Sequence, residues 1–409
     1  MGIQRLKDMV FEYLRMIFSR RDRVDGADEL MALTSLRFVA CFMVVMFHYE
    51  GALFGSFSLI PAASIGFLGV TFFFILSGFI LCYRYSSVDF SRNDLYQFYA
   101  VRFARVYPAY IISVVLSLPF LINAVLYFQE TGQKAVATLL TAGPVLAVAG
   151  LQAWLPGAAC SVNCPTWSIS NEVFFYLCFP FLLQMLRNSA VRLAGAALLC
   201  WLASTVVFVA VWQVFGGSHQ LMATQVTIDM ASDLAAQFIK FVPIGHLHEF
   251  IAGMLAYHLW RRPRAWYGWR LICFSAVAFY ALWRFHADIP EIVFHNGMSI
   301  AVWLPLILGC AGIRRGVLTW PVATFLGRIS FSVYLFHIPV LAVVLGYGSA
   351  VLGEGAMQNR LGLLLLCWAL TLALSALVHL FIEEPARRVI VRQAKQRFSS
   401  RTERALEAA

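Results

Sequence analysis

The sequence has few charged residues for its length. Aspartate, glutamate, lysine and arginine make up 13% of the 409 residues, whereas hydrophobic residues make up 61%. Soluble domains are about 25% charged and roughly 45–50% apolar. A water-soluble fold of this length could not bury so much apolar surface in its interior. Because the bias runs along the whole chain, it also excludes a soluble domain with a single membrane anchor.

The sequence also lacks a cleavable signal peptide and visible repeats. The first thirty residues are charged and contain no apolar core followed by a small-residue cleavage site. We interpret residues 1–30 as a cytosolic amphipathic segment of the kind that can lie on a membrane surface. The tail after residue 388 is short and basic. We therefore expect one membrane domain at residues 31–388 and a cytosolic basic tail at 389–409.

The net charge of +10 comes from 31 basic and 21 acidic residues. The basic residues gather at the ends of apolar runs, which is typical of the inner side of a membrane protein. They form no basic face interleaved with aromatic residues, so we expect no nucleic-acid partner.

Ten apolar runs are long enough to cross a bilayer, which takes about 20 residues. They are Leu33–Gly51, Gly66–Tyr83, Pro108–Phe128, Trp167–Leu186, Leu193–Val214, Ile244–Trp260, Leu271–Phe285, Met298–Ile313, Phe325–Leu345 and Leu361–Ile382.

An eleventh apolar run, Ala135–Trp154, is interrupted by Gly143, Pro144 and Gly150. With the N-terminus in the cytosol, ten crossings place the arginine-rich connections on the inner side, and an eleventh would invert everything after it. The sequence therefore predicts an all-α polytopic membrane protein with about ten transmembrane helices and both termini in the cytosol. We place Ala135–Trp154 outside, as a re-entrant or interfacial segment.

Seven of the nine cysteines fall inside apolar runs, where we expect small packing residues. Cys160 and Cys164 differ because they lie in the predicted outer loop. They could form a short disulfide in an oxidising compartment or remain free thiols. No histidine or second cysteine pair lies nearby, so we expect no metal site.

Ionisable residues inside apolar runs are costly in lipid and point to function. Arg37 and His48 are eleven residues apart in the first run. That spacing is close to three helical turns, so both lie on one face, about 16 Å apart along the axis. The alternatives are a snorkelling arginine and an interfacial histidine, but the shared face favours a functional pair.

The second run carries Ser77 next to Gly78, which could serve helix packing as well as a site. No G-x-S-x-G elbow is present, so Ser77 is not assigned as a nucleophile. Further on, Arg102 and Arg105 neighbour one another on a helix expected to stop before Pro108. They could anchor the helix at the cytosolic face or clamp an anionic phosphate.

Later runs add further polar residues. Ser168 and Glu172 are four apart at the outer end of the fourth run, and His337 lies inside the ninth. Glu383 and Glu384 follow the tenth run, where Glu384 and the following arginines could form a surface salt-bridge cluster.

These segments together resemble the membrane-bound acyltransferase-3 family, in order and content, over about residues 31–388. The match comprises Arg37 and His48, "FFFILSGFIL", "RFAR" before "VYP", "PTWSISNEVFFYL", "PIGHLHEFIAGMLAY", "GRISFSVYLFHIP" and "FIEEPARR". Some members carry an extra esterase-like domain, which this sequence does not contain.

The resemblance implies a ten-span bacterial inner-membrane enzyme that acylates, usually acetylates, an extracytoplasmic sugar with cytosolic acyl-CoA. Polysaccharide biosynthesis is the implied setting, with a carbohydrate acceptor that is free or lipid-linked. It further implies that Arg37, His48 and Glu172 are catalytic, and that Arg102, Arg105, Ser77 and Gly78 bind the donor.

For the chemistry we expect His48, oriented by a carboxylate such as Glu172, to deprotonate the sugar hydroxyl as a general base. An acyl-histidine intermediate at His48 is the alternative route. A transporter or flippase of a glycan or small anion, or a membrane sensor, is the rival class. The matching broken halves that many transporters show are not visible in this sequence.

Overall fold

The computed structural model describes residues 23–24, 27–186, 189–215, 234–262 and 268–407. Most of the expected amphipathic segment, residues 1–22, lies outside the described residues. The only strands among the described residues form one two-residue antiparallel pair, β1 (Arg23–Val24) with β2 (Ala27–Asp28), and the remaining elements are helices joined by turns and loops. The predicted all-α class is confirmed.

The α-helices fill most of the chain. They are α2 (Met31–Phe54), α3 (Gly69–Tyr85), α4 (Arg92–Glu130), α5 (Lys134–Ala149), α6 (Trp167–Leu186), α7 (Ala190–Val214), α8 (Leu234–Phe241), α9 (Leu247–Trp260), α10 (Trp269–Phe285), α11 (Glu291–Val293), α12 (Ile300–Cys310), α13 (Pro321–Leu352), α14 (Glu354–Gln358), α15 (Arg360–Val378) and α16 (Glu384–Glu407).

Short 3₁₀ and π turns join them. They are η1 (Pro61–Leu68), η2 (Gln152–Trp154), η3 (Cys164–Thr166), η4 (Pro243–His246), η5 (His286–Asp288), η6 (Phe294–Met298), η7 (Val317–Thr319) and η8 (His379–Glu383).

Seven helical segments in the described part of the chain have the length and apolar composition needed to cross a bilayer. They contain seven of the ten predicted runs. The other three runs fall on the shorter helices α9, α10 and α12. The chain is thus a multi-pass membrane protein, and the count of ten crossings stays a prediction.

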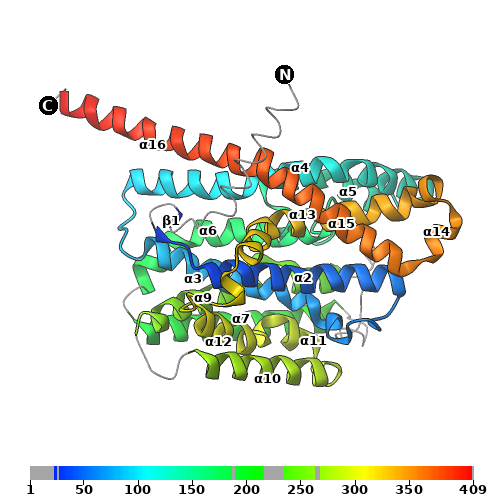
Figure 1. Ribbon diagram of the computed structural model, residues 1–409, viewed down its shortest axis with the longest axis horizontal. Helices are drawn as coiled ribbons and strands as arrows, with labels where there is room; N and C mark the ends of the chain where they lie inside the picture. Colours follow the sequence, from blue (N-terminus) through cyan, green and yellow to red (C-terminus); the bar gives the residue numbers. More distant parts are fainter. Residues whose placement is uncertain (1–22, 25–26, 187–188, 216–233, 263–267, 408–409) are drawn as a thin grey trace.

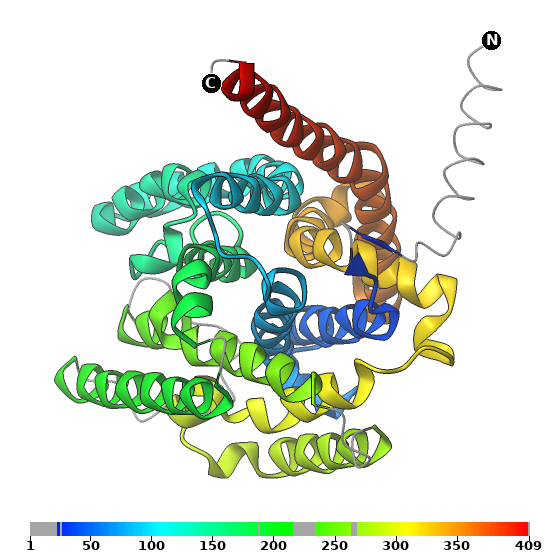
Figure 2. The same cartoon turned by 90° about the vertical axis from the view of Figure 1, so that its left-hand side faces the viewer.

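The long helices lie side by side along one direction, and Figure 2 looks down that direction. Helices α2 and α3 occupy the middle of the bundle (Figure 2). Helix α2 packs against α13, and α3 packs against α9. The described chain begins and ends at the same end of the bundle (Figure 1), which agrees with the predicted even number of crossings.

Glycines allow α3 and α9 to pack backbone to backbone. A Cβ atom on Gly78 would lie 2.1 Å from the carbonyl oxygen of Phe250, and one on Gly253 would lie 1.9 Å from that of Ile75. Any side chain at either position would therefore push the helices apart. Small residues at such crossings are the usual device for close helix contact in membranes.

Helix α4 does not stop before Pro108, and that expectation was wrong. The helix runs continuously through Pro108 and Pro119 for 39 residues, about 58 Å at 1.5 Å per residue. Proline is tolerated inside membrane helices because neighbouring groups satisfy the freed backbone. The hydrocarbon core is only about 30 Å thick, so the helix is long enough to carry Arg102 and Arg105 beyond its apolar part.

The segment 134–166 packs closely against the bundle. Helix α5 lies against α4, and its 16 residues span about 24 Å, less than the hydrocarbon core. In the following loop, Asn163 is buried and donates from Nδ2 to the carbonyl oxygen of Leu335 at 2.8 Å. Cys160 and Cys164 in this loop are joined by a disulfide. Of the two alternatives left open for this pair, the structure contains the disulfide.

Candidate functional site

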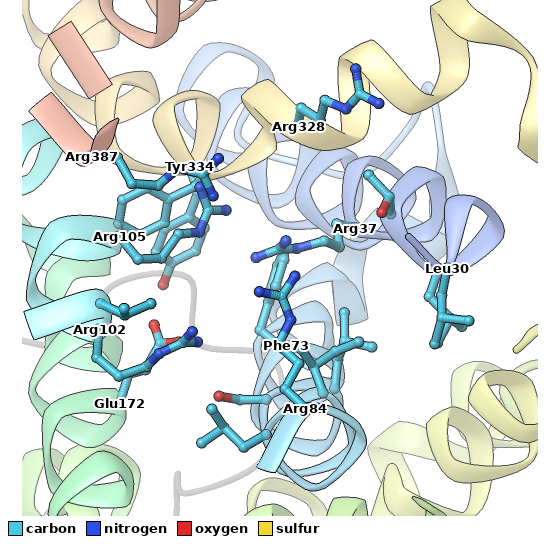
Figure 3. A pocket seen from close by; sticks show the side chains of 18 of the residues that line it. Leu30, Arg37, Phe73, Arg84, Arg102, Arg105, Glu172, Arg328, Tyr334 and Arg387 are labelled. Atoms are coloured by element: carbon cyan, nitrogen blue, oxygen red, sulfur yellow. The ribbon is translucent and has the colours of Figure 1, made fainter. Parts of the chain in front are cut away.

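A pocket opens between α2, α3, α4, α6, α13 and the junction of η8 with α16. Its polar lining consists of Glu29, Thr34, Arg37, Ser77, Tyr83, Arg84, Arg102, Arg105, Ser168, Glu172, Tyr176, Arg328, Tyr334, His379, Glu384 and Arg387. Figure 3 shows Arg37 and Arg84 on one side of this pocket, facing Arg102, Arg105 and Glu172 on the other. Seven site residues were predicted from the sequence. Five of them, Arg37, Ser77, Arg102, Arg105 and Glu172, line this pocket, whereas His48 and Gly78 do not.

The pocket carries an excess of positive charge. Six arginines and three glutamates line it, so its formal charge is 6 − 3 = +3. Arg328 forms an ion pair with Glu29 at 2.7 Å, and Arg387 forms one with Glu384 at 3.0 Å. The lining therefore fits an anionic ligand, because guanidinium groups match phosphate geometry.

Arg105 is held in place by a buried carboxylate. Its Nη1 donates to Glu383, whose side chain is 1% exposed. Glu383 also accepts from Ser332 Oγ at 3.0 Å and lies 3.0 Å from His379 Nδ1. The π turn of η8 places Glu383 inside the bundle, while Glu384 pairs with Arg387 and Arg388. The predicted ion pairs of Glu384 with the following arginines are present. Its predicted place at the surface was wrong, because Glu384 is buried and lines the pocket.

Arg102 is enclosed by aromatic rings. Its guanidinium carbon lies 5.7 Å from the centre of the Tyr85 ring, 6.0 Å from Phe98 and 5.8 Å from Tyr176. Contacts of this kind stabilise a guanidinium group through the ring quadrupole. The two arginines predicted as a clamp thus lie on one helix but have different partners. Glu383 binds Arg105, and aromatic rings surround Arg102.

Arg37 points into the pocket from α2 (Figure 3). Its Nε atom is buried and has no hydrogen-bond partner in the described part of the protein. Buried polar groups are nearly always paired in folded proteins. An unpaired donor that lines a pocket is therefore placed to bind a ligand.

Glu172 lines the same pocket from α6, where its carboxylate accepts a hydrogen bond from Tyr176 Oη. It makes no contact with His48, so our expectation that Glu172 orients His48 was wrong. The family resemblance implied that both residues are catalytic, but nothing in the sequence showed that they are in contact. Glu172 instead belongs with the arginines.

Ser77 and Gly78 are adjacent on α3 but differ in position. Ser77 lines the pocket, as expected of a donor-binding residue. Gly78 does not line it and packs against the backbone of α9 at Phe250. The predicted donor contact of Gly78 is therefore not present, because successive helical residues point in directions about 100° apart.

His48 lies outside the pocket, beside a second histidine. Its Nδ1 atom is 2.9 Å from the carbonyl oxygen of Val44 and 3.2 Å from Nε2 of His337 on α13. Tyr334 separates this pair from the arginines, because its side chain lines the pocket and its ring centre lies 5.9 Å from that of His337. Tyr334 Oη is also hydrogen-bonded to Ser168 Oγ at 2.8 Å.

The motif "PIGHLHEFIAGMLAY" supplies a buried polar cluster elsewhere in the bundle. Glu249 on α9 is fully buried, accepts from Thr71 Oγ1 at 3.0 Å and lies 3.1 Å from His246 Nδ1. The bond from Thr71 joins α3 to α9, and the contact with His246 ties η4 to the start of α9. None of these three residues lines the arginine pocket, so the motif acts here on helix packing.

Comparison with known proteins identifies the family. Residues 32–380 match the acyltransferase-3 family model, which is described as an acyltransferase domain. This match covers most of the chain. The chain belongs to the acyltransferase-3 family. This membership favours an enzyme over a transporter, flippase or sensor.

Two curated relatives are similar to this acyltransferase. It is 26% identical over 383 residues to acyltransferase MdmB of Streptomyces mycarofaciens, covering 89% of this chain and 93% of that protein. It is 31% identical over 158 residues to protein 2 in the picA locus of Rhizobium radiobacter, covering 36% of this chain and 78% of that protein. No solved structure matches the acyltransferase.

Sequence reasoning left several pocket residues of the acyltransferase unassigned. Arg84, Arg328 and Arg387 join the predicted arginines only in the folded chain. His337 and Glu383 stood out as polar residues at the apolar runs, yet no spacing rule linked them to His48 or Arg105. The available signal was their position alone, since their partners lie 289 and 278 residues away.

Proposed function

We propose that this acyltransferase moves an acyl group, most simply acetyl, from cytosolic acyl-CoA to a hydroxyl of an extracytoplasmic or lipid-linked glycan. The cell membrane involved is the inner membrane of a bacterium, and the acylated glycan is an exopolysaccharide, an O-antigen or a similar polymer. Family membership supports acyl transfer, and the positively charged pocket supports an anionic donor.

The observation that carries the proposal is the arrangement of Arg37 and His48 along α2. Arg37 lines the charged pocket, whereas His48 lies eleven residues further on, beyond Tyr334. The separation is about 16 Å along the helix. The arginine-lined pocket and His48 thus lie at different levels along α2, which supports a reaction that starts on one side of the membrane and ends on the other.

The five predicted residues that line the pocket each have a part in this proposal. Arg102 and Arg105 bind the phosphates of coenzyme A, with Arg105 oriented by Glu383. Arg37 and Ser77 line the path of the acyl-bearing arm toward His48. Glu172 lies opposite the arginines of α2 and α3 (Figure 3) and limits the net positive charge of the pocket.

His48 removes the proton of the acceptor hydroxyl, and the hydroxyl oxygen attacks the thioester carbon. The carbon–sulfur bond then breaks, and the leaving sulfur takes the proton back from His48. General base catalysis of this kind contributes about 10²- to 10⁴-fold in rate. An acyl-histidine intermediate at His48 is the other route, in which acyl transfer to the ring precedes transfer to the sugar.

The test is acyl transfer by the purified protein in lipid nanodiscs. Radiolabelled acetyl-CoA is supplied with a glycan acceptor, and both acylated product and free coenzyme A are measured. His48→Ala should lose at least about 100-fold in rate while keeping its thermal unfolding temperature. His286→Ala is the matched control, because His286 lies outside the pocket and contacts the carbonyl oxygen of Trp283.

Near-normal transfer by His48→Ala would reject His48 as the base. Transfer by neither the wild type nor the control, with acetyl-CoA intact, would reject acetyl-CoA as the donor.

A further inference from the structure

His48 on α2, which is half-buried, lies beside the buried His337 on α13, and the proposed reaction does not yet use His337. His337 is 0% exposed, and its Nε2 lies 3.2 Å from Nδ1 of His48. The two ring centres are 5.0 Å apart. No carboxylate of the described residues contacts either ring, which sets this pair apart from the usual histidine–carboxylate arrangement.

Backbone carbonyl groups decide which nitrogen of each ring carries a proton. Nδ1 of His337 lies 2.7 Å from the carbonyl oxygen of Tyr334. A carbonyl oxygen can only accept, so Nδ1 of His337 is the protonated nitrogen. In the neutral ring, Nε2 of His337 is then unprotonated and accepts a hydrogen bond.

The same reasoning applies to His48. Its Nδ1 faces the carbonyl oxygen of Val44 at 2.9 Å and the accepting Nε2 of His337 at 3.2 Å. With acceptors on both sides, Nδ1 of His48 must carry the hydrogen. The Nε2 atom of His48 therefore keeps its lone pair, which is the form that a general base needs.

The helix around His337 is built to hold this arrangement. Pro339 has no N–H, so the carbonyl of Leu335, four residues earlier, loses its helical partner. Asn163 Nδ2 satisfies that carbonyl at 2.8 Å, and Tyr49 Oη donates to the carbonyl oxygen of His337 at 3.1 Å. Tyr49 is in turn hydrogen-bonded to Thr371 at 2.6 Å. Side chains from two other parts of the chain thus bind this turn of α13, and Thr371 holds one of them, Tyr49, in place.

We propose that His337 is a positioning residue that holds His48 in the tautomer with a proton on Nδ1, so that Nε2 accepts the proton of the acceptor hydroxyl. This inference rests on the proposed role of His48. When Nε2 of His48 takes the proton, its Nδ1–H still donates to His337 and Val44, which stabilises the positive ring. His337 thereby has the orienting function that a carboxylate has in a catalytic triad, and it does so without a fixed charge inside the membrane.

The first test compares two substitutions of His337 in the nanodisc assay. His337→Leu removes the acceptor and should lower kcat by at least about tenfold, while the KM for acetyl-CoA stays unchanged because Tyr334 separates His337 from the pocket. His337→Gln keeps an accepting oxygen and should recover part of that loss. A KM rise at constant kcat, or an equal loss in both variants, would overturn the inference.

The second test reads the tautomer directly and does not depend on a variant folding. The wild-type protein is labelled with ¹⁵N-histidine, and the signals of His48, one of nine histidines, are assigned by their absence in His48→Ala. The inference requires a protonated Nδ1 and an unprotonated Nε2 in His48. The opposite tautomer would overturn it.

The two proposals fail separately. Full activity of His48→Ala would reject the proposed function, whatever the tautomer. Loss of activity in His48→Ala, with full activity in His337→Leu, would leave His48 as the base and remove only the positioning role of His337.

Discussion

Arg102 and Arg105 are equivalent in the sequence but not in the folded protein. Arg105 donates to the buried carboxylate of Glu383, whereas Arg102 is surrounded by the rings of Tyr85, Phe98 and Tyr176. Lysine could replace neither well, because its compact ammonium group lacks the planar guanidinium fork. We infer that Glu383 fixes one half of the clamp and the aromatic rings fix the other.

This arrangement predicts how the arginines contribute to donor binding. Arg102→Ala combined with Arg105→Ala should raise the Kd for coenzyme A at least about tenfold, since one hydrogen bond to a charged group is worth about 1.5–3 kcal/mol. Titration calorimetry in nanodiscs measures the effect. Arg315→Ala is the control, because Arg315 is exposed and lies outside the pocket. An unchanged Kd in the double variant would reject the clamp.

At the scale of helices, adjacent residues of α3 face different surroundings: one faces the pocket and the next packs against α9. Ser77 faces the pocket, while Gly78 and Gly253 bring α3 and α9 into backbone contact. Thr71 and Glu249 add a buried hydrogen bond between the same two helices. The crossing of α3 with α9 therefore determines how Ser77 is presented to the pocket.

The close crossing of α3 with α9 can be tested by a substitution that adds one methyl group. Gly253→Ala would place a Cβ atom 1.9 Å from the carbonyl oxygen of Ile75, and overpacking of this kind costs about 1–3 kcal/mol. We expect a lower thermal unfolding temperature in detergent. In the control Gly195→Ala on α7, the added Cβ meets nothing within 4 Å. Its thermal unfolding temperature should be unchanged or slightly higher, because alanine favours a helix over glycine. Equal stability of both variants would contradict the tight crossing.

At the scale of the whole molecule, the bundle separates the two halves of the proposed reaction. The charged pocket lies near the start of α2 and the histidine pair lies further along it, with Tyr334 between them. This separation is useful only if the two ends face different sides of the membrane. The orientation of the bundle is therefore part of the proposed mechanism.

Reporter insertions on either side of α13 test that orientation. Gly316 precedes α13, and Gly353 follows it. With ten crossings and Ala135–Trp154 outside, alkaline phosphatase inserted after Gly316 should be inactive, because it stays in the cytosol, and phosphatase inserted after Gly353 should be active. The reverse pattern would show that Ala135–Trp154 crosses the membrane.

The sequence by itself determined the class of the protein and much of the pocket. Composition required a membrane, because no soluble interior could bury so many apolar side chains. Residue order on a helix placed Arg37 and His48 on one face of α2. Motifs in a fixed order supplied the family, and Arg102, Arg105, Ser77 and Glu172 do line one pocket.

Only the tertiary structure decided which side chains meet. Helical periodicity gives the face and the depth of a residue, but not the neighbouring helix that it contacts. For this reason the sequence allowed Glu172 to be assigned as the partner of His48. In the folded protein His337 contacts His48 instead, because α2 packs against α13. The same limit applies to Gly78, whose neighbour is the backbone of α9, and to Glu383, which a π turn directs toward Arg105. Contacts between helices hundreds of residues apart depend on how the whole bundle packs, and no local pattern records them.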